Sequence, residues 1–204
     1  MPRRLVIAIT GASGVQYGIS ALLRLSQDQE VETHLVLTKG ARAVLAAETA
    51  WSAAEVCDLA DVVHANHDLG AAIASGSYRT EGMLIAPCSI KTLSGIANCY
   101  DDSLAVRAAD VALKEQRRLV LLVRETPLHA RHLSLMSAVA SAGGIVMPPV
   151  PAFYTRPATV ADIVDDTIEH ALGLFGLDRG ADGWTGTRSL AGLSEIRPAR
   201  TQRS

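Results

Sequence analysis

The chain has 204 residues, of which 49% are hydrophobic and 20% are charged. This composition is typical of a globular protein and is too apolar for a disordered one. Its 19 basic and 21 acidic side chains give a formal net charge of −2. The chain therefore lacks the positive excess that nucleic-acid clamps and polybasic membrane anchors need.

Short apolar runs alternate with helical patterns along the chain. We expect strands at Leu5–Ile9, Val31–Leu37, Gly82–Ala86, Leu119–Val123 and Ile145–Met147. We expect helices after Gly14, at Ala41–Thr49, at Leu104–Gln116 and at His129–Ala142, and Asp102 or Ser103 is the expected N-cap of the third of these. Thr159 can cap a last helix. The apolar stripe of this helix consists of Ile163, Val164, Ile168, Ala171, Leu172 and Phe175. Such alternation predicts one α/β domain with a doubly wound, mostly parallel sheet over residues 1–178. The polar, Gly-rich segment 179–204 is expected to be a mobile tail or to dock on a neighbouring subunit.

The sequence gives little support for a targeting segment or a metal site. No apolar run approaches the ~20 residues that span a bilayer, and Leu5–Ile9 is too short for a signal peptide. The three cysteines, Cys57, Cys88 and Cys99, show no CxxC pair and cannot all pair with one another. This pattern favours a reducing compartment, hence the cytoplasm. Six histidines without a His/Cys cluster argue against a zinc site.

The carboxyl ends of parallel strands are where ligands bind in open sheets, and here two of them carry distinctive residues. Thr10–Gly14 (Thr-Gly-Ala-Ser-Gly) follows the first strand and opens a helix, whose N-terminus favours an anion. It is neither GxGxxG nor a Walker motif, so a phosphate-bearing mononucleotide fits better than a dinucleotide. A tight turn without ligand is an equal alternative. Ser89 and Thr92, after the third strand, either hold a phosphate or merely cap a helix.

Further charged and reactive residues allow two interpretations each. Arg124-Glu125 directly follows a buried strand and indicates a site, unless it forms a surface ion pair. Arg107 and Lys114 lie two helical turns apart on one face of a helix. This face is either part of a site or a basic surface exposed to solvent. Cys88 is expected to be a buried structural thiol rather than a nucleophile. His64 is expected in a polar, solvated loop.

Taken together, these stretches resemble the flavin prenyltransferase (UbiX-like) family, which includes small subunits formerly called phenylacrylic or hydroxyarylic acid decarboxylases. The similarity runs in order from about Leu5 to about Leu177. The matching stretches are Thr10–Gly18, Ser75–Ser77, Ala86–Thr92, Arg107–Glu115, Arg124–Leu128 and Pro148–Tyr154. The resemblance implies a flavodoxin-like fold, assembly into a dodecamer, and transfer of a dimethylallyl group from dimethylallyl phosphate to N5 and C6 of reduced FMN. The product would serve a UbiD-like decarboxylase.

The resemblance also implies roles for individual residues. FMN would be held by Gly11, Ala12, Ser13, Thr38, Ser89, Ile90, Lys91, Thr92 and Arg124. Catalysis would involve Ser13, Glu48 facing the flavin, and Glu125 near the prenyl phosphate. That phosphate would be bound by Arg107, Lys114, Tyr154 and His170. Cations and a phenol can stabilise a departing phosphate without a metal, and a carboxylate or the phosphate itself can remove the proton that must leave the flavin.

One departure from the family and two alternatives follow from the same residues. His170 stands where the family has Arg or Lys, so we expect weaker or pH-dependent donor binding. An FMN-binding carrier protein that has lost prenyl transfer is one alternative. An FMN-dependent decarboxylase of peptidyl- or pantothenoyl-cysteine is another, which needs a His on the early helix and an Asn in the loop after Pro87. Neither residue is present in Ala41–Thr49 or Pro87–Thr92.

Overall fold

A single parallel sheet organises the chain in the computed structural model, which describes residues 2–177. Within these residues six strands lie in the order β3-β2-β1-β4-β5-β6, and every neighbouring pair is parallel. The strands are β1 (Arg3–Ile9), β2 (Val31–Leu37), β3 (Val62–His64), β4 (Gly82–Cys88), β5 (Arg118–Val123) and β6 (Ile145–Val146). This topology confirms the predicted doubly wound α/β fold.

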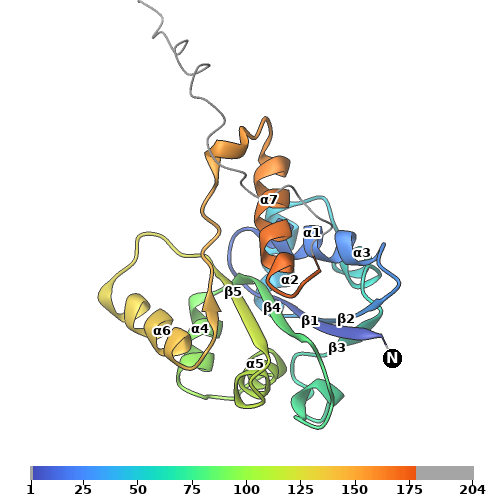
Figure 1. Cartoon of the computed structure of the whole chain (residues 1–204), viewed down its shortest axis with the longest axis vertical. Helices are drawn as coiled ribbons and strands as arrows, with labels where there is room; N and C mark the ends of the chain where they lie inside the picture. Colours follow the sequence, from blue (N-terminus) through green and yellow to red (C-terminus); the bar gives the residue numbers. More distant parts are fainter. Residues whose placement is uncertain (1, 178–204) are drawn as a thin grey trace, which may run out of the picture.

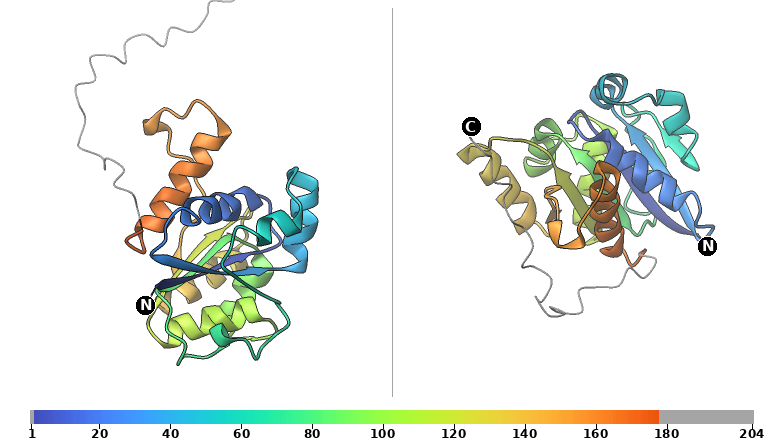
Figure 2. Two further views of the ribbon diagram at one scale, coloured as in Figure 1. Left: turned by 90° about the vertical axis from the view of Figure 1, so that its right-hand side faces the viewer. Right: turned by 90° about the horizontal axis from the view of Figure 1, so that it is seen from above.

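Helices cover both faces of the sheet (Figure 1). They are α1 (Val15–Leu25), α2 (Lys39–Glu48), α3 (Ala53–Cys57), α4 (Ile90–Ala97), α5 (Leu104–Lys114), α6 (Ala130–Ser141) and α7 (Val160–Gly173), with 3-10 turns η1 (Ala72–Ala74) and η2 (Phe153–Thr155). The buried side chains of α1, α2, α3 and α7 belong to the core on one face, and those of α4, α5 and α6 to the core on the other. Figure 2 shows α1 and α7 side by side on the same side of the sheet. No helix within residues 2–177 is long and apolar enough to cross a membrane.

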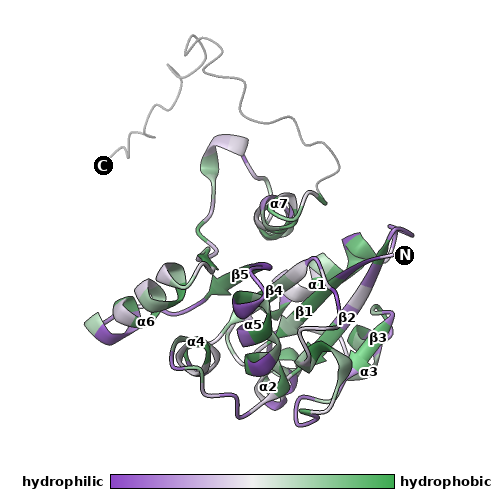
Figure 3. Ribbon diagram, turned by 60° about the horizontal axis from the view of Figure 1, so that its bottom comes forward, coloured by the Kyte–Doolittle hydropathy of each residue, from purple (hydrophilic) through white to green (hydrophobic). Residues whose placement is uncertain are grey.

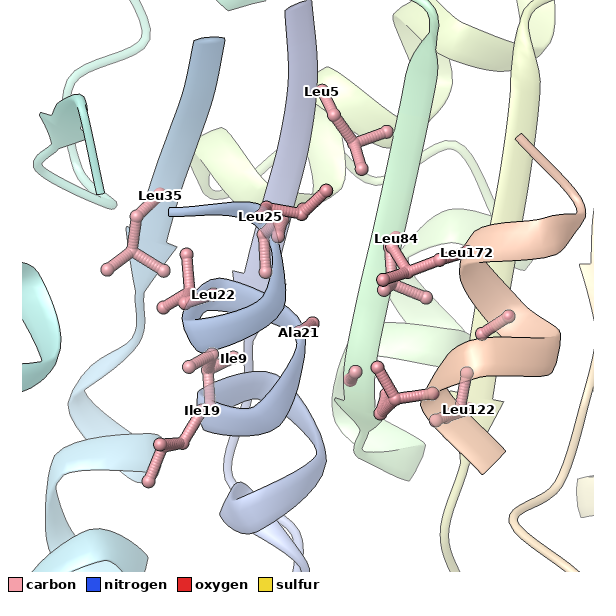
Figure 4. Close-up of a cluster of buried hydrophobic side chains, with 14 of the residues drawn as sticks. Leu5, Ile9, Ile19, Ala21, Leu22, Leu25, Leu35, Leu84, Leu122 and Leu172 are labelled. Carbon is pink, nitrogen blue, oxygen red and sulfur yellow. The ribbon is translucent and has the colours of Figure 1, made fainter. Parts of the chain in front are cut away.

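The two cores follow from the alternation of side chains along the central strands. Leu5 and Ile7 of β1 pack in the core of the α1 face, whereas Val6 and Ala8 pack in the core of the α5 face. In the close-up of Figure 4, Leu172 of α7 lies over the strands together with the leucines of α1. Figure 3, coloured by hydropathy, shows hydrophobic residues along the central strands. Each fully buried leucine stabilises the fold by about 1.5–3 kcal/mol.

Most predicted elements are confirmed, and their ends shift for identifiable reasons. The helix expected at Ala41 starts at Lys39, because Thr38 caps it by accepting a hydrogen bond from the Ala41 N–H at 3.2 Å. Strand β4 does not end at Pro87 but continues to Cys88, with a register shift between Ile85 and Cys88. A shift is expected there because proline has no N–H for the ladder.

Other findings concern caps and elements that sequence periodicity did not reveal. Thr159 caps α7 as predicted, within a capping box. Ser103 occupies the N-cap position of α5 without a side-chain cap bond. Helix α3 and strand β3 are short and were not predicted. The expectation that His64 lies in a solvated loop is wrong, because it belongs to β3 and its Nε2 lies 2.9 Å from Nδ1 of the buried His34. The predicted tail, 179–204, lies outside the described residues.

Candidate functional site

The chain reverses its winding direction between β1 and β4, two neighbouring strands in the centre of the sheet. In doubly wound sheets the loops on either side of such a point separate and leave a crevice beyond the carboxyl ends of the strands. The loop Gly11–Gly14 follows β1, and Ser89 follows β4. Thr38 follows β2, and Arg124 with Glu125 follows β5. The structure thus brings the predicted FMN-binding residues to one edge, hereafter the carboxyl edge.

Thr10 ties the two loops at the switch point together. Its hydroxyl donates to the Pro87 carbonyl at 2.8 Å and accepts from the Ser89 N–H at 2.8 Å. The side chain is only 1% exposed, so water does not compete for these bonds. The position of Ser89 is therefore set by the end of β1 as well as by β4.

Three helices, α1, α2 and α4, begin at the carboxyl edge, where each presents the positive end of its dipole. Thr38 caps α2, and Ser89 caps α4 by accepting from the Thr92 N–H at 3.3 Å. The capping interpretation of Ser89 is thus confirmed, and its hydroxyl also donates to Oγ1 of Thr92 at 3.1 Å. Helix α1 differs, because its N-cap is Gly14, which has φ of 97° and no side chain to cap the helix.

Glu48 reaches this glycine loop from the last turn of α2. Its Oε2 accepts a hydrogen bond from the Gly14 N–H at 2.8 Å, beside Ser13. The loop also packs tightly on α2, because an ideal Cβ on Gly11 would lie 3.0 Å from the Gly40 Cα. Glu48 is exposed, so its carboxylate is accessible at the edge of the loop.

Arg124 supplies a cation to the carboxyl edge. Its main-chain N–H donates to the Cys88 carbonyl at 3.1 Å, which fixes where the side chain leaves β5. The side chain is exposed, and no ion pair involves it within residues 2–177, so the expected alternative of an Arg124–Glu125 surface pair is not found there. Glu125 is exposed as well, and its Oε1 accepts from the Thr126 N–H at 3.0 Å.

Lys91 and Cys88 lie at the carboxyl edge, but the Lys91 ammonium is paired with a carboxylate and the Cys88 thiol is buried. The Lys91 ammonium pairs with Asp102 at 3.0 Å, on an exposed part of α4. Cys88 is fully buried, and burial raises the pKa of its thiol far above the usual range. Cys88 is therefore a structural thiol, as the sequence favoured. The described part of the chain holds no group of three or more metal-ligating side chains.

Arg107 and Lys114, predicted to bind the prenyl phosphate, lie at opposite ends of α5. Arg107 pairs with Asp101 at 3.0 Å and with Asp110 at 3.1 Å. Lys114 ends α5 and contacts Glu115 at 2.5 Å, which lowers the pKa of that carboxyl. Because the chain passes directly from Lys114 into the amino end of β5, Lys114 lies at the opposite edge of the sheet, about 20 Å away along the strands.

Tyr154 and His170, the other two residues predicted to bind the prenyl phosphate, lie on neither end of α5. Tyr154 is exposed in η2, on the loop beyond β6, and His170 is exposed in the last turn of α7. Since α7 and α5 cover opposite faces of the sheet, His170 and Lys114 are separated by the sheet itself (Figure 1). Within one chain the predicted donor-binding residues are therefore dispersed.

The segment Ser75–Tyr78, hereafter the serine turn, was matched in sequence but given no role. The structure places it against the end of α5, because an ideal Cβ on Gly76 would collide with the Glu115 carboxylate and would lie 2.8 Å from the Lys114 Nζ. The hydroxyl oxygens of Ser75 and Ser77 lie 2.9 Å apart. The Ser-Gly-Ser sequence was the available indication, but nothing in its spacing pointed to α5.

Comparison with known proteins places the chain in a family. The family model described as Flavoprotein matches residues 1–170. The flavin prenyltransferase UbiX of Neisseria meningitidis is 56% identical over 178 residues, which are 87% of this chain and 94% of that protein.

Comparison with solved structures gives the same family. A structure of AnUbiX (PadA1) in complex with FMN and dimethylallyl pyrophosphate is 46% identical, covers 92% of this chain and all of its own, and has a TM-score of 0.89. A dodecameric FMN-dependent UbiX-like decarboxylase from Escherichia coli O157:H7 is also 46% identical, covers 90% of this chain and all of its own, and has a TM-score of 0.87. The chain belongs to the Flavoprotein family and, within it, to the UbiX flavin prenyltransferases.

Proposed function

We propose that the protein joins the dimethylallyl group of dimethylallyl phosphate to N5 and C6 of reduced FMN, and that a UbiD-like decarboxylase receives the prenylated flavin. The observation that carries this proposal is the carboxyl edge, where three helix N-termini meet the exposed guanidinium of Arg124. Such an edge suits the phosphate of a mononucleotide. A solved relative binds FMN and dimethylallyl pyrophosphate, which supports FMN and a phosphorylated dimethylallyl donor as the substrates.

The flavin would be held by Gly11–Ser13, Thr38, Ser89–Thr92 and Arg124. The uncapped start of α1 offers main-chain N–H groups, and Arg124 offers a cation without a carboxylate partner among the described residues. Thr38 and Ser89 already accept hydrogen bonds from their own helices. The Thr38 hydroxyl can still donate to the flavin, whereas the Ser89 hydroxyl would first have to turn away from Thr92. Bound and reduced, the flavin supplies the nucleophilic N5 and C6.

The protein's part in the chemistry is to stabilise the leaving phosphate, exclude water and move one proton. As the C–O bond of the donor breaks, the negative charge on phosphate oxygen grows, and Lys114, Arg107, Tyr154 and His170 are the groups that would stabilise it. A base must then accept the proton lost when the flavin ring is restored. Glu48 supports this role through its position beside Ser13, and Glu125 is the second candidate.

The dispersed donor-binding residues become one site only if neighbouring copies share it. Lys114 and His170 lie on opposite faces of the sheet, so a single chain does not bring them to one phosphate. A dodecameric relative supports assembly of this chain into a homo-oligomer. We place the enzyme in the cytoplasm because all three cysteines are free thiols.

The test is anaerobic incubation of the full-length protein with reduced FMN and dimethylallyl phosphate, followed by mass spectrometry of the extracted flavin. Parallel incubations with dimethylallyl diphosphate identify the donor. We expect prenylated FMN above a no-protein control, and a loss of product in Glu48→Gln. Tightly bound but unmodified FMN with either donor would contradict prenyl transfer and support the alternative of a flavin carrier.

A further inference from the structure

The serine turn rests on the end of α5. Its Tyr78 N–H donates to the Ser75 carbonyl at 3.2 Å, which closes the turn. The Gly76 backbone lies against the Lys114–Glu115 ion pair, so an ideal Cβ there would lie 2.8 Å from the Lys114 Nζ and would collide with the Glu115 carboxylate. A phosphate bound beside the two serine hydroxyls would take the place of this carboxylate on the Lys114 ammonium.

Arg117 holds this turn by two of its carbonyls. Its Nη1 donates to the Tyr78 carbonyl at 2.7 Å, and its Nη2 donates to the Gly76 carbonyl at 2.5 Å. Only arginine presents two donors in one rigid plane, so it fixes both the distance and the angle between the turn and α5. The main-chain N–H of Arg117 in turn donates to the Ala112 carbonyl at 2.8 Å, which anchors the residue to the helix that bears Lys114.

The other end of the turn is anchored to the sheet. The Tyr78 hydroxyl lies 3.2 Å from Nε2 of His34 and 3.4 Å from Oε1 of Glu32. The Arg4 guanidinium stacks over the Tyr78 ring at 4.6 Å from its centroid and donates through Nε to the same Glu32 oxygen at 2.9 Å. Arg107 holds the residue before the turn, because its Nε donates to the Ala74 carbonyl at 3.2 Å. The turn can therefore leave Lys114 only partly unless the bonds from Arg117, the contacts of Tyr78 and this bond from Arg107 are all lost.

We propose that Arg117 is a positioning residue for the prenyl donor, which acts by clamping the serine turn against Lys114. Arg117 does not contact the donor itself, since its guanidinium is occupied by the two carbonyls. Its effect reaches the phosphate only through the turn. The inference rests on the proposed function, in which Lys114 binds the donor phosphate.

The experiment compares full-length Arg117→Gln and Arg117→Lys with wild type, and uses Arg118→Gln as the matched control. Arg118 is the adjacent arginine and is exposed at the start of β5. Donor affinity is measured as KM in the anaerobic prenylation assay and as the calorimetric Kd of dimethylallyl phosphate for the oxidised FMN complex. We expect Arg117→Gln to raise both by about tenfold, as for loss of charge-assisted hydrogen bonds. Arg117→Lys keeps the charge and one bond, so a rise of about threefold is expected.

Two further readouts separate positioning from general damage. The Kd of FMN and kcat should stay within about twofold of wild type, because the guanidinium of Arg117 bonds the serine turn and none of the residues proposed to bind FMN. In a Lys114→Ala background, Arg117→Gln should change the donor Kd by less than about twofold, because the clamp acts on a group that is no longer there. Multiplicative effects in the double variant would overturn the inference, as would a parallel loss of FMN affinity.

The outcomes also distinguish the inference from the function on which it rests. A raised donor Kd in Lys114→Ala together with a wild-type Kd in both Arg117 variants overturns the role of Arg117 alone. A wild-type donor Kd in Lys114→Ala overturns the placement of the donor phosphate, and the inference with it. If Arg117→Gln does not fold, Arg117→Lys and Tyr78→Phe replace it, because each weakens one anchor of the turn. The role of Arg117 is then judged by the ratio of donor Kd between each variant and wild type.

Discussion

Replacing Thr10 with valine should destabilise the fold and weaken flavin binding together. Valine has the same shape but no hydroxyl, so the half-buried Ser89 N–H loses its acceptor and the Pro87 carbonyl loses its shorter hydrogen bond. The carbonyl keeps the Thr10 main-chain N–H at 3.3 Å, so most of the loss falls on Ser89. An unsatisfied buried N–H costs about 1–3 kcal/mol. We expect a loss of about 2 kcal/mol in the free energy of unfolding, which lowers Tm by about 4–8 °C.

The same substitution should raise the Kd of FMN by about tenfold, because the start of α4 is no longer fixed to the end of β1. Urea denaturation followed by circular dichroism gives the stability at one fixed protein concentration, since assembly adds to it. Fluorescence titration gives the Kd.

Thr33→Val is the matched control for Thr10→Val. Thr33 is equally buried, and its hydroxyl donates to Asp61 at 2.8 Å and accepts from the Asp61 N–H at 3.0 Å, far from the carboxyl edge. It should lose comparable stability and keep wild-type FMN affinity, while Thr10→Ser should keep both nearly intact. Wild-type stability in Thr10→Val, or equal loss of FMN affinity in Thr33→Val, would refute the reasoning.

Three further predictions concern packing, reactivity and the donor site. Gly18→Ala should lower stability by about 1–3 kcal/mol in urea denaturation, because the new Cβ would lie 2.5 Å from the Ala86 carbonyl oxygen; an unchanged midpoint would show that α1 can move away. In the native protein at pH 8, iodoacetamide should modify the exposed Cys99 and leave Cys88 unmodified in peptide mass spectra, because burial keeps Cys88 protonated. His170→Arg should lower KM for dimethylallyl phosphate, because a guanidinium binds phosphate with two parallel hydrogen bonds that an imidazole cannot offer; an unchanged KM would exclude His170 from the phosphate site.

The sequence predicted the central sheet well because both faces of its strands are buried. Val31–Leu37 was predicted to the residue, and the near-continuous apolarity of Leu119–Val123 left few alternatives. The grouping of the FMN-binding residues followed as well, since parallel strands must bring their carboxyl ends to one edge.

The remaining features depend on contacts that no local pattern encodes. Strand β3 has only three residues, two of them half-buried, so it lacks a period to detect. Its His64 looks polar in sequence but is held by the buried His34 of β2. The bond from Arg107 to the Ala74 carbonyl and the contact of Gly76 with Lys114 join distant parts of the chain. The dispersal of the donor-binding residues appears only in three dimensions.

The sheet ends on very short strands at both sides, three residues in β3 and two in β6. An outer strand of this length offers few unpaired main-chain groups to a passing chain, so strand-by-strand growth into fibrils is disfavoured. The same brevity restricts how copies can associate, since two such margins cannot merge into a continuous sheet. Within residues 2–177 we therefore expect contacts between copies to form through side chains on helices and loops, where geometry is specific and growth can stop at a finite number of subunits.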